Sequence, residues 1–263
     1  MTATLPVRTS RFAARYVMER NMLNNRRCWA AYVSGFFEPM FYLLSLSVGV
    51  SHLVGDVTGP DGRPMSYQVF LAPAMLAASA MNGSVLDSTY NLHHKLRHAR
   101  VFEAIRATPL GPRDIAVGEI VSATIRGGTY AVFFVAAMAA LGLVRSAWAV
   151  LAVPAAWLIG AAFASIGAAA TTYVRHWGDL EWVSVVLLPL FLFSATFYPP
   201  SRCPSGVRPL LELSPLYHGV VVVRGLTTGV VGPGLLWHVA VLLGLAAVGT
   251  TVAARRLDRI LCD

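Results

Sequence analysis

The sequence predicts an all-α, polytopic membrane protein with six transmembrane helices. Of its 263 residues, 56% are hydrophobic and only 13% are charged, whereas soluble domains carry about 25% charged residues. A soluble surface of this size needs more ionic groups to stay dispersed. The apolar residues gather in long stretches, and most basic residues lie between alternate stretches. These observations favour a bilayer protein over a soluble domain.

Six stretches are long enough to cross a bilayer. A transmembrane helix needs about 20 mostly apolar residues to cover a hydrocarbon core about 30 Å thick. Lipid offers the backbone no hydrogen-bond partners, so each stretch must form a helix. The predicted spans are residues 35–54, 67–86 and 120–144, a span within 146–174, residues 182–200, and a span within 225–254 that starts near Leu235.

The basic residues orient these spans. Loops that stay in the cytoplasm carry an excess of lysine and arginine. Placing both termini inside puts fifteen basic residues on the cytoplasmic side and five outside, and it requires an even number of spans. The predicted location is therefore the cytoplasmic membrane. The net charge of +8 is expected to face anionic lipid, and no nucleic-acid partner is expected.

The N-terminal segment, residues 1–34, is predicted to lie along the membrane surface. Phe12, Tyr16, Met22 and Leu23 alternate there with arginines, a pattern typical of an amphipathic helix in the inner headgroup layer. Simple anchoring of the first span explains the pattern equally well. The rest of the chain, residues 35–263, forms the predicted transmembrane domain.

The inner loop at residues 87–119 is predicted to act as a lever. A helix is expected from His93 to Ala107, and the run from Pro109 to Pro112 then forces a turn. A new helix is expected to begin at Arg113 or Asp114 and to continue into the third span. A partner that pushes on a short helix between two spans can move both. The alternative is a solvated basic loop on lipid headgroups.

The outer segment, residues 199–234, is rich in proline and glycine yet apolar. Two short helices are expected, near residues 207–213 and 215–226. Both are too short to cross the bilayer, so they are predicted to form a hairpin that dips into the outer leaflet.

Sites for chemistry are sparse. A phosphate-binding P-loop needs a glycine-rich turn followed by Lys and Ser or Thr, but Leu96 follows the only lysine, Lys95. The chain is therefore not expected to hydrolyse ATP or to bind a cofactor. His94 and His98 have a spacing found at zinc sites, but no metal is expected because the usual glutamate between them is missing. Two other hypotheses remain: a membrane-embedded enzyme that uses His93, His94 or His98, and a scaffold without transport activity.

Two sets of residues within the spans are candidates for function. Charges at membrane depth tend to pair or to serve a function, and Glu38 and Arg126 lie at matching predicted depths, which predicts an ion pair. Aromatic residues in the fifth span are candidates for an apolar path or gate, although packing against lipid is equally compatible. They are Phe191, Phe193, Phe197 and Tyr198.

Four stretches in order resemble a known family over nearly the whole chain. They are FFEPMFYLLSLSVGVS in the first span, FEAIRATPLGPRDIAVGEI in the inner loop, FLFSATFYPP in the fifth span and LSPLYHGVVVVRGL outside. The sequence resembles the membrane subunits of type-two ABC exporters. It is most similar to the branch with nodulation-factor (lipo-oligosaccharide) export permeases and daunorubicin-resistance permeases.

The resemblance implies a permease that exports an amphipathic, lipid-linked or drug-like molecule. It implies two copies of a separate ABC ATPase subunit, which binds ATP and Mg, and a second membrane subunit, identical or related, with the path between the two. It also implies that the inner loop docks on the ATPase. The coupling residues would be Phe102, Glu103, Ile105, Arg106, Thr108, Pro109, Leu110 and Arg113.

Overall fold

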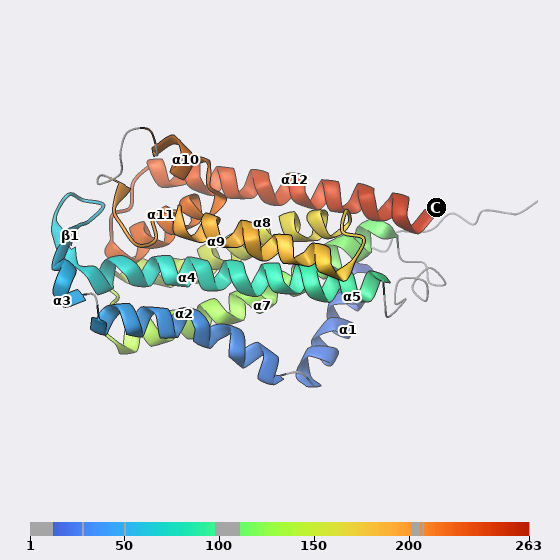
Figure 1. The fold of residues 1–263 in the computed structure, drawn as a ribbon, viewed down its shortest axis with the longest axis horizontal. Coiled ribbons are helices and arrows are strands. Elements are labelled where there is room, and N and C mark those ends of the chain that lie inside the picture. Colours follow the sequence, from blue (N-terminus) through green and yellow to red (C-terminus); the bar gives the residue numbers. More distant parts are fainter. Residues whose placement is uncertain are drawn as a thin grey trace, which may run out of the picture.

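The chain folds into a bundle of long helices along one axis (Figure 1). The computed structural model describes residues 13–27, 29–49, 51–97, 111–200, 206 and 208–262. One end of the bundle holds α1 (Ala13–Arg27), the start of α7 (Pro112–Ala140) and the ends of α5 (Leu92–Arg97) and α12 (Gly234–Cys262) (Figure 1). A small β-hairpin lies at the other end (Figure 1). The predicted coupling residues 102–110 fall outside the described residues.

The N-terminal part confirms a helix in the segment predicted to lie along the membrane surface. Helix α1 (Ala13–Arg27) is followed by α2 (Trp29–Gly49) and by the one-turn helix α3 (Ser51–Val54). Helix α2 packs against α4 (Tyr67–Leu86). On α1, Val17 is buried, whereas Tyr16 is 65% exposed. Met22 and Leu23, two further apolar residues of the amphipathic pattern, are also exposed.

A two-stranded hairpin follows α3 and was not predicted. Strand β1 (Asp56–Thr58) pairs antiparallel with β2 (Pro64–Ser66). The turn needs Gly62, whose φ of 79° is costly for residues with a Cβ. Strands of three residues are too short to show the alternation of apolar and polar residues by which strands are recognised in a sequence.

Helix α4 (Tyr67–Leu86) forms the centre of the bundle and has the predicted bounds of the second span. Large side chains such as Phe70, Met75 and Met81 are almost completely buried. The helices that pack around α4 are α2, α7, α8 (Ala152–Thr171) and α11 (Pro215–Thr228). The π-helix η1 (Asp87–Asn91) and α5 (Leu92–Arg97) continue it, so the predicted inner loop begins as an extension of α4.

Helix α7 (Pro112–Ala140) confirms the prediction of one helix that runs from the inner loop into the third span. Its first turn is capped because Asp114 Oδ2 accepts a hydrogen bond from Gly111 N at 3.1 Å. Close approach to α4 depends on Gly127, where an added Cβ would lie 2.5 Å from the Ala80 carbonyl oxygen. Such small residues let helices pack without a hydrophobic driving force.

Two further long helices complete the bundle. The 3-10 helix η2 (Ala147–Leu151) leads into α8 (Ala152–Thr171), which packs on α4, α7 and α12 (Gly234–Cys262). The small residues of α8 meet side chains of the same chain: an added Cβ at Gly167 would clash with Ser88, and one at Gly160 with Ser84.

The fifth predicted span is shorter than expected. The 3-10 helix η3 (Trp177–Leu180) leads into α9 (Glu181–Leu192), and residues 193–199 are not helical. Ala195 has a φ of 55°, which interrupts the helix. The prediction of a continuous helix over 182–200 was therefore wrong. Two short helices then follow where they were predicted, α10 (Arg208–Leu213) and α11 (Pro215–Thr228).

Arg224 of α11 explains why the chain can unwind after α9. This buried guanidinium donates to the carbonyl oxygens of Ala195 at 3.0 Å and Phe70 at 3.2 Å, and it lies 3.8 Å from the centroid of the Phe70 ring. A buried carbonyl that leaves a helix needs such a replacement donor.

Four helices of the described chain are long and apolar enough to cross a membrane. They are Tyr67–Arg97, Pro112–Ala140, Ala147–Thr171 and Gly234–Ile260. The chain therefore has the makeup of a multi-pass membrane protein. With 12 residues, α9 measures about 18 Å, less than the bilayer core, so the number of six spans stays a prediction.

Candidate functional site

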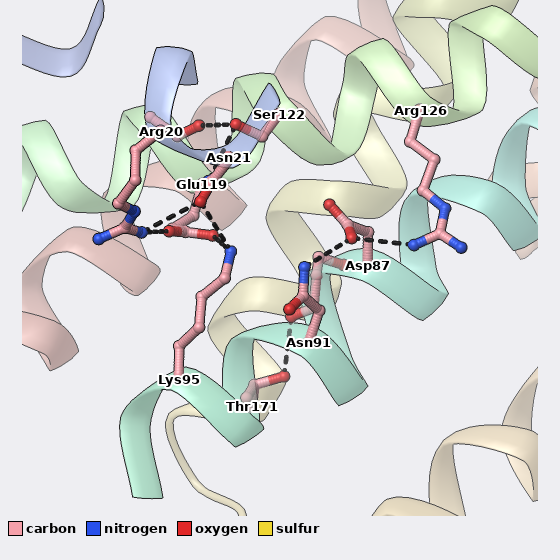
Figure 2. Close-up of polar contacts among 11 residues, drawn as sticks. Arg20, Asn21, Asp87, Asn91, Lys95, Glu119, Ser122, Arg126 and Thr171 are labelled. Atoms are coloured by element: carbon pink, nitrogen blue, oxygen red, sulfur yellow. Dashed lines mark hydrogen bonds and ion pairs between the residues drawn. The ribbon is translucent and has the colours of Figure 1, made fainter. Parts of the chain in front are cut away.

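A buried polar network joins three helices at the end of the bundle where α5 stops and α7 starts (Figure 2). Glu119 of α7 accepts from Arg20 of α1 at 2.9 Å and from Lys95 of α5 at 2.6 Å. Asn21 Oδ1 accepts from Lys95 Nζ at 3.1 Å, and Asn21 Nδ2 donates to Ser122 Oγ at 3.1 Å. These five residues are called the Glu119 cluster.

The Lys95–Glu119 pair of the Glu119 cluster is buried, whereas the side chain of Arg20 is 36% exposed. Glu119 is 4% exposed and Lys95 is 7% exposed, whereas Lys and Glu are rarely buried unless paired. Removing one partner of a buried ion pair costs about 3–5 kcal/mol because the other charge is left uncompensated. Sliding α5 along α7 carries a similar penalty, so the two helices are expected to move as one unit.

A second group of buried charges lies next to the Glu119 cluster, farther from the ends of α5 and α7 that border the inner loop (Figure 2). Asp87 Oδ1 accepts from Arg126 Nη1 at 3.1 Å and from Asn91 Nδ2 at 2.9 Å, and Arg126 Nε donates to Tyr130 OH at 3.2 Å. These four residues are called the Asp87 cluster.

The partner of Arg126 differs from the prediction. The structure pairs Arg126 with Asp87, and within the described part of the chain no ion pair joins it to Glu38. The prediction compared depth along the bilayer only. Two helices at the same depth can face different neighbours, and the side of α7 that carries Arg126 faces α4 and η1.

The π-helix brings both clusters onto one face. Lys95 follows Asp87 by eight positions, so in an ideal α-helix the two side chains would point about 80° apart. The wider turn of η1 accommodates about one extra residue, which reduces the offset to about 20°. Asp87 and Lys95 therefore both face α7, opposite Arg126 and Glu119. The hydroxyls of Ser88 and Thr89 support this turn by donating to the Val85 carbonyl.

Helix α1 is held to α7 by more than the charges. Its Val17 packs so closely on Gly118 that an added Cβ there would lie 2.6 Å from Val17 Cβ. Leu96, Ala116 and Leu257 add an apolar contact between α5, α7 and α12 nearby. The elements on both sides of residues 98–110 thus form one packed unit.

Of the predicted coupling residues, Arg113 is the one that lies within the described part of the chain, and it belongs to this packed unit. Arg113 lies in the first turn of α7, beside a polar cleft that also includes Arg255 and Asp258 of α12. The others, Phe102, Glu103, Ile105, Arg106, Thr108, Pro109 and Leu110, lie outside the described residues.

Sequence reasoning missed the Glu119 cluster, although two signals were present. Lys95 is the only lysine, and Glu119 stands at the edge of an apolar stretch in a helix that also carries Arg126. Pairing between residues 24 positions apart depends on how α5 and α7 pack, which spacing alone does not reveal.

The histidines of the inner loop differ in their exposure to solvent. His93 is buried and makes an edge contact with Trp177 at 5.8 Å between ring centroids, whereas His94 is exposed. His98 lies outside the described residues. Within the described part of the chain, no group of three side chains has the makeup of a metal site.

The candidate path residues lie beside a cleft between α2, α4 and α9. Phe191 and Phe197 line it, and their ring centroids are 5.2 Å apart. Phe193 is 44% exposed and does not belong to the lining, nor does Tyr198. Tyr42 of α2 approaches Phe191 at 6.4 Å. The structure thus brings two of the four predicted aromatics together.

Comparison with known proteins identifies the family. Residues 13–227 match the model of the family described as ABC-2 type transporter. Nodulation protein J of Rhizobium leguminosarum bv. viciae is 28% identical over 263 residues, covering 98% of this chain and 99% of that protein. Nodulation protein J of Bradyrhizobium diazoefficiens is 30% identical over 213 residues, covering 79% and 78%. The chain therefore belongs to the ABC-2 type transporter family, as a type-two ABC permease.

Proposed function

We propose that the chain is the membrane subunit of an ATP-driven exporter, with ATP hydrolysed by separate ATPase subunits bound near residues 98–113. The observation that carries this proposal is the Glu119 cluster, because it joins α1, α5 and α7 where the inner loop starts and ends. A force on the loop would reach three helices at once.

The rod formed by α4, η1 and α5 supports transmission of that force. It runs without a break over 31 residues from Tyr67 to Arg97, or about 46 Å. One end belongs to the Glu119 cluster, while Ala78, Asn82 and Leu86 line the cleft at α2 and α9. A tilt at the inner end would therefore change the width of the cleft.

The exposed helices support a second membrane subunit. None of the described residues of α9 is buried, and Phe41 of α2 is 63% exposed. Two such faces would enclose a path between copies of this chain or between this chain and a related one. The cleft, whose described lining is mostly apolar with one charged residue, fits an amphipathic, lipid-linked or drug-like cargo.

Affinity purification of the tagged chain from native membranes tests the proposal. An ATPase subunit should co-purify, and Arg113→Glu should lower its recovery about fivefold or more, since reversing one interface charge costs about 1 kcal/mol or more. Arg145→Glu is the matched control, because Arg145 is also exposed but follows the end of α7, whereas Arg113 lies at its start.

Gel filtration of each variant separates lost docking from misfolding. Absence of any ATPase from the purified complex, or equal recovery with Arg113→Glu and Arg145→Glu, would contradict the proposed coupling surface. No observation on the described residues favours catalysis by the inner histidines.

A further inference from the structure

The cleft between α2, α4 and α9 carries one charge. It has a volume of about 310 Å³, the size of a site for a small organic molecule. Its lining is mostly apolar, with Tyr42, Leu187, Phe191 and Phe197, and Glu38 is the one charged residue among the described residues that line it. This region is called the Glu38 cleft.

Glu38 lies far from either end of its helix. It is the tenth of the 21 residues of α2, so about 14 Å of helix separates it from the start at Trp29. Helix α2 lies in the first predicted span, and within a bilayer a carboxylate so far along the helix would be costly unless it pairs or serves a function.

No partner for Glu38 occurs in the part of the chain that the structure describes: neither a hydrogen bond nor an ion pair is formed by its carboxylate. Arg126, the cation expected at its depth, is engaged by Asp87 at 3.1 Å. The carboxylate instead borders the cleft, next to Asn82 and Ser184. The cleft therefore combines a mostly apolar lining with one negative charge.

The aromatic rings favour the same kind of ligand. Phe191 and Phe197 meet edge to face at 5.2 Å, and Tyr42 lies 6.4 Å from Phe191. Faces of aromatic rings attract cations and also stack on apolar groups. An anionic group, in contrast, would be repelled by Glu38 and would find no cation in the described lining.

We propose that the Glu38 cleft binds an amphiphile with a positively charged group, which pairs with Glu38 while the apolar part lies against Phe191 and Phe197. This inference rests on the proposed permease function and names the chemical class of its cargo. It also makes Glu38 a specificity-determining residue that discriminates against anions.

Direct binding to the full chain in nanodiscs of zwitterionic phosphatidylcholine tests the proposal without the ATPase. The probes are tetraphenylphosphonium and tetraphenylborate, a cation and an anion of nearly the same shape. Equilibrium dialysis measures binding in excess of that to empty nanodiscs. The wild type should bind excess tetraphenylphosphonium and no excess tetraphenylborate.

Three variants make the test specific. Glu38→Gln should weaken tetraphenylphosphonium binding about tenfold, which corresponds to one partly desolvated ionic contact. Glu38→Asp should keep the affinity within about threefold because the charge remains. Glu181→Gln removes an exposed carboxylate at the start of α9, outside the cleft lining, and should leave binding unchanged.

Three results overturn the inference: no excess tetraphenylphosphonium on the wild type, equal binding by Glu38→Gln, or excess tetraphenylborate. A shift of Glu38→Gln from dimer to monomer with unchanged cation binding also overturns it, because Glu38 then pairs with a second subunit. None of these results affects co-purification of an ATPase, so failure here and failure of the permease proposal are distinguishable.

Discussion

Buried cations hold the two ends of the bundle in different ways. At the end near the inner loop, Lys95 pairs with the carboxylate of Glu119 at 2.6 Å. At the other end, Arg224 is 4% exposed and donates to the neutral carbonyl oxygens of Phe70 and Ala195. Both sites join segments that are distant in the sequence, but only one joins them through opposite charges.

This difference has a mechanical meaning. Separating a buried ion pair leaves two uncompensated charges, so the Glu119 cluster favours rigid motion of α1, α5 and α7 together. Movement of residues 193–197 would release only the neutral carbonyl of Ala195, which can return to a helical hydrogen bond, while the guanidinium of Arg224 keeps its hydrogen bond to Phe70. The end near the inner loop is therefore suited to transmitting force, and the end near α11 to local rearrangement of residues 193–200.

The largest expected effect is at Glu119. Glu119→Gln leaves Lys95 and Arg20 without a counter-charge and should lower the free energy of unfolding by about 3–5 kcal/mol. Thermal unfolding in detergent measures the loss. Glu181→Gln is the control and should change stability by less than about 0.5 kcal/mol. Similar losses for both variants would show that the cluster does not hold these helices.

The second-largest loss of stability is expected when Asp87, the partner of Arg126, is replaced. Asp87→Asn should cost about 2–4 kcal/mol, less than Glu119→Gln because Arg126 is 16% exposed. The exchange Asp87→Arg with Arg126→Asp should recover part of the loss caused by either reversal alone. The exchange Glu38→Arg with Arg126→Glu should not recover stability. If only the exchange of Glu38 and Arg126 recovers stability, Arg126 pairs with Glu38 rather than with Asp87.

A smaller effect is expected at Arg224. Arg224→Gln removes two donors from buried carbonyl groups and should cost about 1–3 kcal/mol. Hydrogen exchange should rise at residues 193–197 before it rises in α4. If exchange rises equally throughout the bundle, Arg224 supports the whole fold rather than the unwound segment.

The smallest effect is expected at Tyr67, whose hydroxyl donates to the Phe197 carbonyl oxygen at 3.4 Å. Tyr67→Phe should lower stability by about 0.5–1 kcal/mol, because the bond is long and partly exposed. Unfolding curves of Tyr67→Phe and Tyr217→Phe, a tyrosine on α11, provide the comparison. A loss as large as that of Arg224→Gln would mean that the outer contacts are stronger than their geometry suggests.

Many helices were predictable from the sequence. The apolar run at residues 67–86 coincides with α4, and α7 begins at Pro112, close to the start expected at Arg113 or Asp114 from the turn signals before it. The two short helices α10 and α11 also appear where proline and glycine divide the outer segment. These features depend on local hydrogen bonding and apolar length, which a single sequence contains.

The site was less predictable. Phe191 and Phe197 were identified as path residues by composition, but the cleft beside them depends on how α2 and α4 approach α9. The early end of α9 depends on Arg224, which lies 29 positions from Ala195. A local pattern cannot contain a donor supplied by another helix.

Composition and apolar length alone determined that this chain is a helical membrane protein, because lipid forces apolar segments to satisfy their own backbone. Only the packed bundle decided which charges meet. The π-turn at Asp87–Asn91 rotates Lys95 toward Glu119 and gives Arg126 to Asp87, which leaves Glu38 beside the cleft. The physical reason is that ion pairing depends on the rotation of each helix about its axis, and neighbouring helices set that rotation.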